Sequence, residues 1–375
     1  MSMRFGFVST YPPTQCGLAT FTAALRGALL RDPGDEGRVV RLVDTPLPGP
    51  GEVVAQLVAG DAASLRQAAE HLSQCDVAIV QHEYGVYGGA DGNEVLDLLD
   101  QVTVPSVVIL HTVLASPTTH QRQVLEAAVA RADAVVTMTA TARARLAAGY
   151  AVDLGKVAII AHGAPVLHSA MAGPPARTGP FTVLTWGLLG PGKGVEWGVA
   201  AMALLRDLAP MPRYVIAGQT HPKVALREGD AYRDRLREQV RQAGLGAWIS
   251  FDGHYRNAGA LASLLRSADV VLLPYDSTEQ VTSGVLIEAV AAGKPVVATQ
   301  FPHARELLAG GAGLLVPHRD PAAIAAALRS VITRGDVMSR MAAAAAAAAP
   351  RLLWPAIADQ YRELADRLIS ASVPA

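Results

Sequence analysis

Short apolar runs rich in Val and Ile alternate with Ala-, Leu- and Arg-rich segments along the first half of this chain. The apolar runs lie at residues 4–10, 76–81, 106–110, 134–138 and 157–161. Runs of this length, bounded by polar or small residues, are typical of parallel strands that are buried on both faces. The segments between them, such as residues 121–131, have the composition of helices. The alternation predicts a doubly wound parallel sheet.

The pattern stops at residues 165–180, which are rich in Pro, Ala and Gly, and then starts again. Strands are predicted at residues 181–186, 213–217, 270–273, 296–299 and 313–316. Helices are predicted near residues 195–208, 231–243, 258–267, 284–292 and 321–333. We therefore expect two Rossmann-like α/β domains, residues 1–170 and 181–349, joined by a linker. An amphipathic helix within residues 350–375 is expected to cross back to the first domain.

The composition excludes several classes of protein. Of the 375 residues, 51% are hydrophobic and 17% are charged, which fits buried α/β cores rather than disorder. The net charge of −1 gives no basic stripe for nucleic acid. Two cysteines, Cys16 and Cys75, form neither a disulfide framework nor a zinc site. We expect no signal peptide, and the sequence has no apolar run that approaches the ~20 residues of a membrane span. We therefore predict a cytoplasmic chain.

Polar groups follow the predicted strands, at the edge of an open α/β sheet where ligands bind. In the first half, residues 11–20 include Gln15 and Gly17, and Gly17 would let the backbone approach a sugar or phosphate. Three histidines also follow strands, namely His82, His111 and His162. A lone histidine is more often structural than catalytic, but three at strand ends favour a site. Their spacing matches no metal-ligand pattern on one helix, so we expect no metal.

A glycine-rich turn at residues 187–194 follows the first strand of the second half and contains G-x-x-x-x-G-K. A Walker A loop requires Ser or Thr after the Lys, to hold magnesium, and this chain has Gly194. A P-loop NTPase is therefore disfavoured. Lys193 fits a cation beside a diphosphate. Considered without the rest of the sequence, it fits a solvated Lys in a Gly turn equally well.

The most specific stretch of the second half is residues 280–299. Ser283-Gly284 opens a predicted helix, whose first amides have no intrahelical partner and lie at the positive end of the helix dipole, so they can receive a phosphate. Glu288 lies about one turn further on, where a carboxylate can accept hydrogen bonds from ribose hydroxyls. Alone, Glu288 would be read as an ordinary buried Glu. Together with its surroundings, the stretch favours a nucleotide site.

With these motifs in place, the chain resembles the family 4 retaining glycosyltransferases of the GT-B fold, in which two Rossmann-like domains face a central cleft. The resemblance extends over essentially the whole chain. Its specific parts are residues 280–299 and the Lys193 turn. Its supporting parts are the loop after the first strand, His111-Thr112, Gly253-His254-Tyr255, the motif at residues 306–317 and the final helix with Trp354.

The resemblance implies that the second domain binds a nucleotide-sugar and the first binds the acceptor. The reaction would depend on His111, Lys193 and Gln280. The donor would be bound by Gly17, Gly187, Lys193, Gly253, His254, Ser283, Gly284, Val285 and Glu288, and the acceptor by Gln15, His82, Glu83 and Tyr84. The enzyme would transfer a hexose, with mannose favoured, to the hydroxyl of a carbohydrate or small-molecule acceptor. The donor would be GDP-mannose, or next UDP-glucose, and the transfer would retain the anomeric configuration and need no metal. Peripheral membrane contact stays open.

Two positions depart from the family pattern. Leu188 stands where the family usually has an Arg that helps to neutralise the diphosphate, and Gln280 stands where it usually has a Glu. Arg256 or Lys223 would then have to supply the missing charge. The alternatives are a non-catalytic nucleotide-sugar-binding partner subunit and a GT-B-fold epimerase of UDP-sugars.

Overall fold

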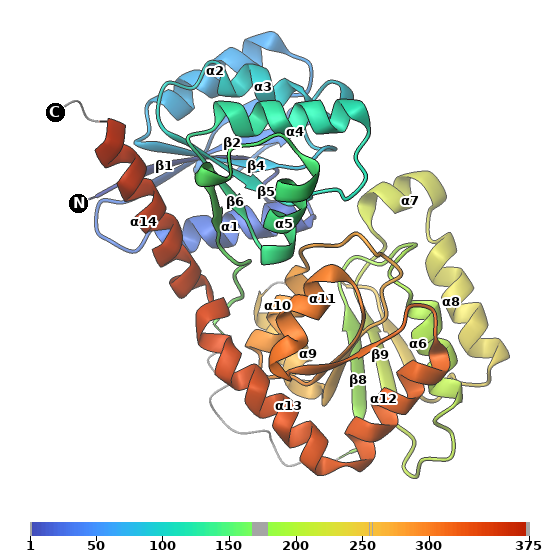
Figure 1. Ribbon diagram of the computed structural model, residues 1–375. Helices are drawn as coiled ribbons and strands as arrows, with labels where there is room; N and C mark the ends of the chain where they lie inside the picture. The colour runs from blue at the N-terminus through green and yellow to red at the C-terminus, as the bar shows by residue number, and fades with distance from the viewer. Residues whose placement is uncertain (1, 167–178, 255, 257, 373–375) are drawn as a thin grey trace. The chain divides into compact units, whose positions relative to one another are not determined.

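The computed structural model describes residues 2–166, 179–254, 256 and 258–372 (Figure 1). The chain forms two compact units. The first consists of Met1–Gly163 with Trp354–Ala375, and the second is Ala164–Leu353. Most of the predicted linker at 165–180, and Tyr255 of the predicted site, lie outside the described residues.

The first unit is built on a seven-stranded sheet in the order β3-β2-β1-β4-β5-β6-β7. All neighbouring strands are parallel, and Val107, for example, pairs with Ile79 on one side and Ala134 on the other. The strands are β1 (Arg4–Ser9), β2 (Glu36–Val43), β3 (Val53–Val58), β4 (Val77–His82), β5 (Ser106–Leu110), β6 (Ala134–Thr137) and β7 (Val157–Ile159).

Helices cover both faces of this sheet. They are α1 (Gly17–Leu29), α2 (Ala62–Ser73), α3 (Glu94–Leu99), α4 (Thr119–Arg131), α5 (Ala140–Gly149) and α14 (Trp354–Ser372). Helices α2, α3 and α4 lie side by side, and α1 packs against α14 (Figure 1). The final helix therefore completes the apolar core of the first unit, in which its Ile357 and Tyr361 are buried with Phe5 and Leu25.

Strands β2 and β3 do not appear in the sequence-based assignment. Both carry polar residues inside the strand, and so lack the unbroken apolar run by which the other strands are recognised. Arg41 of β2 is fully buried, and its guanidinium donates to the carbonyls of Pro48 (3.1 Å) and Leu47. These carbonyls lower the cost of a charged residue inside a sheet, although its Nε has no partner among the described residues.

The second unit is built on a six-stranded parallel sheet in the order β10-β9-β8-β11-β12-β13. The strands are β8 (Thr182–Trp186), β9 (Arg213–Ala217), β10 (Ile249–Asp252), β11 (Val270–Leu273), β12 (Val296–Thr299) and β13 (Gly313–Val316). Both sheets are doubly wound, so the predicted α/β fold class is confirmed.

Helices connect the strands of the second sheet. They are α6 (Val195–Ala203), α7 (Pro222–Glu228), α8 (Ala231–Gln242), α9 (Ala258–Ser267), α10 (Gly284–Ala291), α11 (Pro302–Leu307), α12 (Pro321–Thr333) and α13 (Gly335–Ala348). The core of this unit gathers buried aliphatic side chains such as Val199, Leu236 and Leu272.

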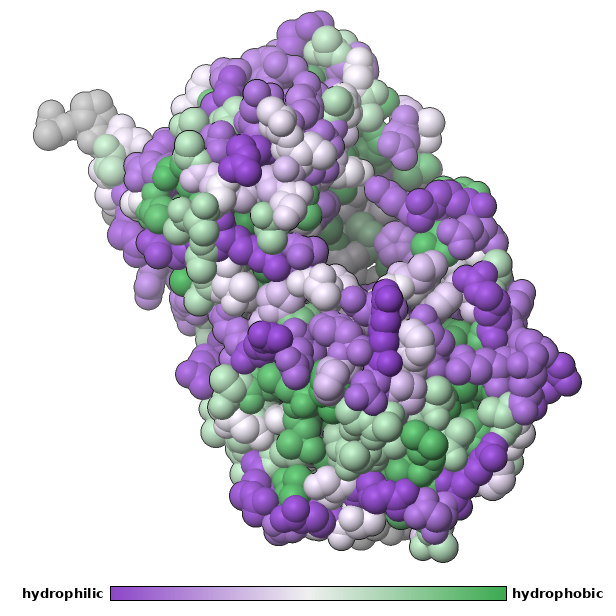
Figure 2. Space-filling model, turned by 45° about the vertical axis from the view of Figure 1, so that its right-hand side comes forward, coloured by the Kyte–Doolittle hydropathy of each residue, from purple (hydrophilic) through white to green (hydrophobic). Residues whose placement is uncertain are grey.

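The surface mixes polar and apolar residues, and on the face shown in Figure 2 the two kinds are interspersed over both units. Large exposed apolar side chains are scattered, as at Leu47, Leu204 and Leu226. Among the described residues, none of the helices combines the length and the hydropathy needed to cross a bilayer.

The chain passes between the units at two places, after Gly163 and before Trp354. The two passages lie side by side, since the amide of Ala164 donates to the carbonyl of Leu352 (2.8 Å) and Ala164 forms a bridge with Leu353. Gly163 also packs directly on Trp354. A Cβ atom at Gly163 would lie 2.2 Å from the indole ring, so only glycine fits there without movement of the Trp.

We expect Gly163→Ala to lower the free energy of unfolding of the first unit by about 1–3 kcal/mol, the usual cost of overpacking. Urea unfolding followed by fluorescence measures this. Gly149→Ala is the matched control, because a Cβ at Gly149 meets nothing within 4 Å. Equal stability of the two variants would show that the Trp354 ring moves aside without cost.

Candidate active site

Three glycines follow neighbouring strands at the carboxyl edge of the second sheet. Gly187 directly follows β8, Gly218 follows β9 and Gly253 follows β10. Gly187 and Gly218 have φ values of 118° and 129°, and a Cβ atom at Gly218 would lie 1.9 Å from the carbonyl oxygen of Gly187. The two backbones therefore touch, and they present a bare main-chain surface that a ligand can approach closely.

The Lys193 turn is held against the segment that follows β11. The amide of Asp276 donates to the carbonyl of Gly192 (2.9 Å), and Gly194 is left-handed (φ 63°) because its Cα lies against the carbonyl of Pro274. The ammonium of Lys193 lies 4.3 Å from the centre of the buried Tyr275 ring. This cation–π contact holds a half-buried positive charge at the sheet edge.

The amino end of α10 offers unpaired amides. Ser283 is the N-cap, and its hydroxyl accepts from the amide of Leu286 (3.3 Å). Among the residues that the structure describes, no acceptor faces the amides of Gly284 and Val285. Because they begin a helix and lie at the positive end of its dipole, these two amides are available to an anion.

The backbone of Ser283 has a different partner from the predicted one. Its amide donates to Nδ1 of His303 (2.8 Å), a residue only 3% exposed, so this amide is occupied and does not receive a phosphate. Ser283 instead shapes the helix start. Sequence analysis missed His303, although the same rule of examining the residues after each strand would have found it behind β12.

Glu288 lies one turn further along α10, half-buried and facing the end of β8. The indole Nε1 of Trp186 donates to its carboxylate (3.3 Å). Burial raises the pKa of Glu288 to about 7, against a smaller opposing effect of that hydrogen bond. Val285, on the same helix, lies 3.4 Å from the position of a Cβ at Gly187. The structure thus brings Gly187, Val285 and Glu288 together.

Other predicted residues of the second unit point elsewhere. The side chain of Gln280 donates to the carbonyl of Thr282 in its own loop (3.0 Å). His254 is 89% exposed and pairs with Asp252 (2.8 Å). Arg256 also pairs with Asp252, so its charge is already balanced.

In the first unit, His111 is joined to the neighbouring strand. Its Nε2 lies 2.5 Å from Oε1 of Gln81. Since an amide oxygen only accepts, Nε2 carries the proton and Nδ1 is left as an acceptor. Burial, and next the nearby His162 and His82, lower the pKa of His111 to about 3. His111 is therefore neutral at physiological pH and is suited to hydrogen bonding rather than to carrying charge.

The predicted acceptor-binding residues divide into buried and open ones. His82 is 1% exposed, so it does not offer its ring to an acceptor, contrary to its predicted role. Glu83 is half-buried and accepts from the hydroxyl of Thr112 (2.6 Å) and the amide of Tyr84 (3.1 Å). Gln15 is exposed.

The loop after β1 is capped by a thiol. Cys16 is the N-cap of α1, its Sγ accepts from the amide of Ala19 (3.4 Å), and Gly17 begins the helix with open space beside it. An aromatic cluster lies behind this loop. Phe21 meets the rings of His111 (5.0 Å), His162 (5.0 Å) and Trp354 (5.1 Å) edge to face. Phe21 therefore links the ring of His111 to Trp354 at the start of the final helix.

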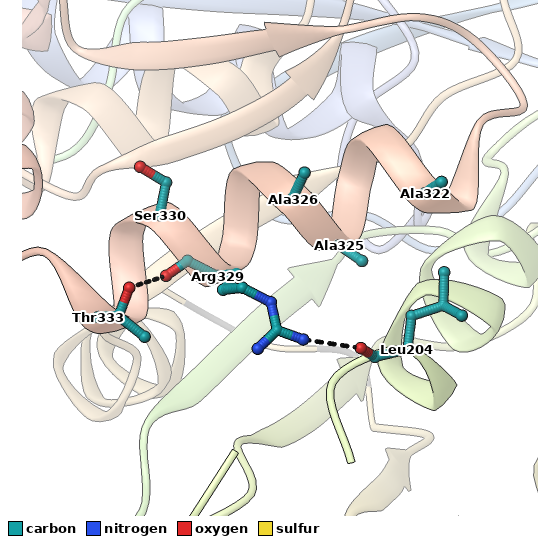
Figure 3. Close-up of a pocket in the computed structure, with 7 residues that line it drawn as sticks. All are labelled: Leu204, Ala322, Ala325, Ala326, Arg329, Ser330 and Thr333. Carbon is teal, nitrogen blue, oxygen red and sulfur yellow. Dashed lines mark hydrogen bonds between the residues drawn. The ribbon is translucent and has the colours of Figure 1, made fainter. Parts of the chain in front are cut away.

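Two cavities lie elsewhere on the second unit. One, of about 440 Å³, is a groove between α12 and the end of α6 that contains none of the predicted residues (Figure 3). The other, of about 450 Å³, adjoins the glycine turn at Pro191 and Gly192 and is bordered by Tyr232, Asp276 and Arg319. Within the described part of the chain, no three His, Cys, Asp or Glu side chains are grouped to hold a metal.

Known proteins with similar sequences are glycosyltransferases. Residues 180–334 match the family model of glycosyl transferases group 1. Glycogen synthase of Mycobacterium tuberculosis is 30% identical over 218 residues, 58% of this chain and 50% of that protein. Phosphatidyl-myo-inositol mannosyltransferase of the same organism is 38% identical over 167 residues, 42% and 41% of the two chains. The chain thus spans half or less of the length of these two relatives.

Solved structures match over nearly the whole chain. Anabaena HepE, determined in complex with UDP, has a TM-score of 0.74 at 20% identity, covering 98% of this chain and 100% of that one. Sucrose-phosphate synthase of Thermosynechococcus elongatus has a TM-score of 0.73 at 20% identity, covering 99% and 100%. At this identity the likeness concerns the fold, and it confirms the predicted GT-B fold.

The raised pKa of Glu288 should make the second unit less stable as the pH rises. Its pKa rises from an ordinary 4.5 to about 7 on folding, so between these pH values the folded protein holds a proton that the unfolded chain has lost. The free energy of unfolding therefore falls as the pH rises from 4.5 to 7, and is level above 7. Glu288→Gln removes this dependence. Its stability relative to the wild type should rise by on the order of 2–3 kcal/mol between pH 5 and pH 8.

Urea unfolding of both proteins across this pH range tests the expectation. Glu70→Gln, at an exposed position of α2, is the control and should show no such trend. A constant difference between the wild type and Glu288→Gln would mean that Glu288 ionises in the folded protein as it does in the unfolded chain.

Proposed function

We propose that this chain is a retaining hexosyltransferase that acts on a nucleotide-diphosphate sugar, because residues 180–334 match the family model of glycosyl transferases group 1. The observation that supports this most is the unpaired amides of Gly284 and Val285 beside Gly187, with Glu288 one turn away. This arrangement offers donors for a phosphate and, one helical turn away, a carboxylate for a ribose.

In the proposed reaction, the bond between the anomeric carbon and the diphosphate oxygen breaks, and a bond to the acceptor oxygen forms on the same face of the sugar. The acceptor proton leaves with the departing phosphate oxygen. Negative charge grows on that oxygen, and the Lys193 ammonium and the α10 amides stabilise it electrostatically. Positive charge grows on the sugar ring. His111, being neutral, adds no repulsion there, and its free Nδ1 accepts a hydrogen bond from a sugar hydroxyl.

We further propose GDP-mannose as the donor, with UDP-glucose second. The mannosyl preference is supported by the 38% identical mycobacterial mannosyltransferase, and the glucosyl alternative by the 30% identical glycogen synthase. Because Lys193 and helix amides are available to the diphosphate, the reaction needs no metal. Glu83, Tyr84 and Gln15 are proposed to contact the acceptor.

Calorimetric titration with GDP, UDP, ADP, GDP-mannose and UDP-glucose, with EDTA present, tests the donor site. Selective binding of the guanine ligands is the expected outcome. Lys193→Ala should weaken GDP binding by about 1.5–3 kcal/mol, the usual worth of hydrogen bonds to charged groups. Lys156→Ala is the control, since that side chain binds carbonyls of the first unit. If none of the ligands binds, the donor-site proposal fails. Binding of a nucleotide-sugar without hydrolysis or transfer would favour the non-catalytic partner subunit.

His111→Ala should reduce turnover far more than donor affinity, because its proposed contact is with the reacting sugar. Donor-sugar hydrolysis without an acceptor provides the rate, and calorimetry provides the affinity. The Gln81–His111 hydrogen bond offers a comparison: Gln81→Met removes the acceptor for Nε2 but keeps the neutral imidazole, and should retain more activity than His111→Ala. A fully active His111→Ala enzyme would remove His111 from the reaction.

A further inference from the structure

Arg233 of α8 is a buried cation at the carboxyl edge of the second sheet. Its side chain is 6% exposed, and Nη2 donates to the carbonyl of Gly218. Nη1 lies 2.6 Å from the position of a Cβ at Gly253, so the guanidinium fills the space that this glycine leaves open. Arg233 thus lies beneath the ends of both β9 and β10.

The charge of Arg233 has no carboxylate beside it among the residues that the structure describes. Its Nε also lacks a partner there, and Nη2 donates to a neutral carbonyl. Nearby arginines differ: Arg256 pairs with Asp252, and Arg319 pairs with Asp276 (3.3 Å). Burying an arginine without a counter-charge is costly, and a bound anion would reduce that cost.

Contacts connect Arg233 with the proposed phosphate position. Arg233 binds Gly218, Gly218 touches Gly187, and Gly187 lies next to Val285, whose amide is open. Leu188, beside Gly187, supplies no charge at this edge. A buried charge acts at longer range than an exposed one, because water screens it less.

We propose that Arg233 supplies the positive potential by which this chain prefers a nucleoside diphosphate over the uncharged nucleoside. It acts through the field of a fixed guanidinium and through the position of Gly218, in place of a cation at residue 188. The proposal rests on the proposed donor site. It adds that the selectivity for phosphate comes from a residue of α8 as well as from Lys193.

Titrations with guanosine, GMP and GDP test this in the intact chain, with Arg233→Met and Arg233→Lys as the variants. Arg233→Met is expected to weaken GDP binding about tenfold, as loss of one poorly screened charge would, and to leave guanosine binding almost unchanged. Arg233→Lys keeps the charge and should keep most of the preference for GDP. Arg235→Met removes an exposed charge from the same helix and is the matched control.

If Arg233→Met does not fold, Arg233→Gln keeps a donor for the Gly218 carbonyl without the charge and gives the same comparison. Equal weakening of guanosine and GDP would overturn the proposal and leave Arg233 as a support of the loops. Unchanged GDP affinity would overturn it as well. A wild-type chain that binds neither GDP nor GMP would instead overturn the donor site itself, which separates the two failures.

Discussion

The contact between the Gly187 and Gly218 backbones organises the candidate donor site. The carbonyl of Gly187 occupies the space where any side chain at 218 would be, so β8 and β9 end in direct main-chain contact. From there, Trp186 reaches Glu288, Gly187 reaches Val285, and Gly218 reaches Arg233. Val285, Glu288 and Arg233 therefore all lie next to this one close approach, whereas Lys193 is held separately by the Tyr275 ring. A side chain at Gly218 would collide with the Gly187 carbonyl and separate the elements that carry those groups.

In the first unit, side-chain hydrogen bonds rather than main-chain contacts hold the ends of neighbouring strands together. Gln81–His111 and Glu83–Thr112 are two hydrogen bonds between the segments that end β4 and β5. Phe21 contacts the rings of His111, His162 and Trp354, next to the places where the chain leaves and re-enters this unit. The orientation of a neutral imidazole is therefore fixed by packing and by one hydrogen bond, without any charge.

Local pattern was enough to predict most of the fold and the segments of the site. Apolar runs identify a buried parallel strand wherever the strand is apolar throughout. They do not identify β2, whose buried Arg41 donates to main-chain carbonyls of the following loop. The amides of Gly284 and Val285 follow from the start of a helix alone. His303 and Arg233 do not, because their importance comes from what they contact: the amide of Ser283 and the carbonyl of Gly218. Likewise, the burial of His82 depends on the packing of the finished sheet.

Burial of charge links these features. Leu188 and Gln280 are neutral at positions where the family usually presents charges to the ligand, whereas Glu288 is half-buried and Arg233 is buried. A charge on an exposed loop is screened by water and salt, and must be ordered when the ligand binds. A buried charge costs folding stability, but its field is fixed before the ligand arrives. In a donor site of this kind, the buried charges would lower the stability of the second unit. They would already be in position when a diphosphate and a ribose bind.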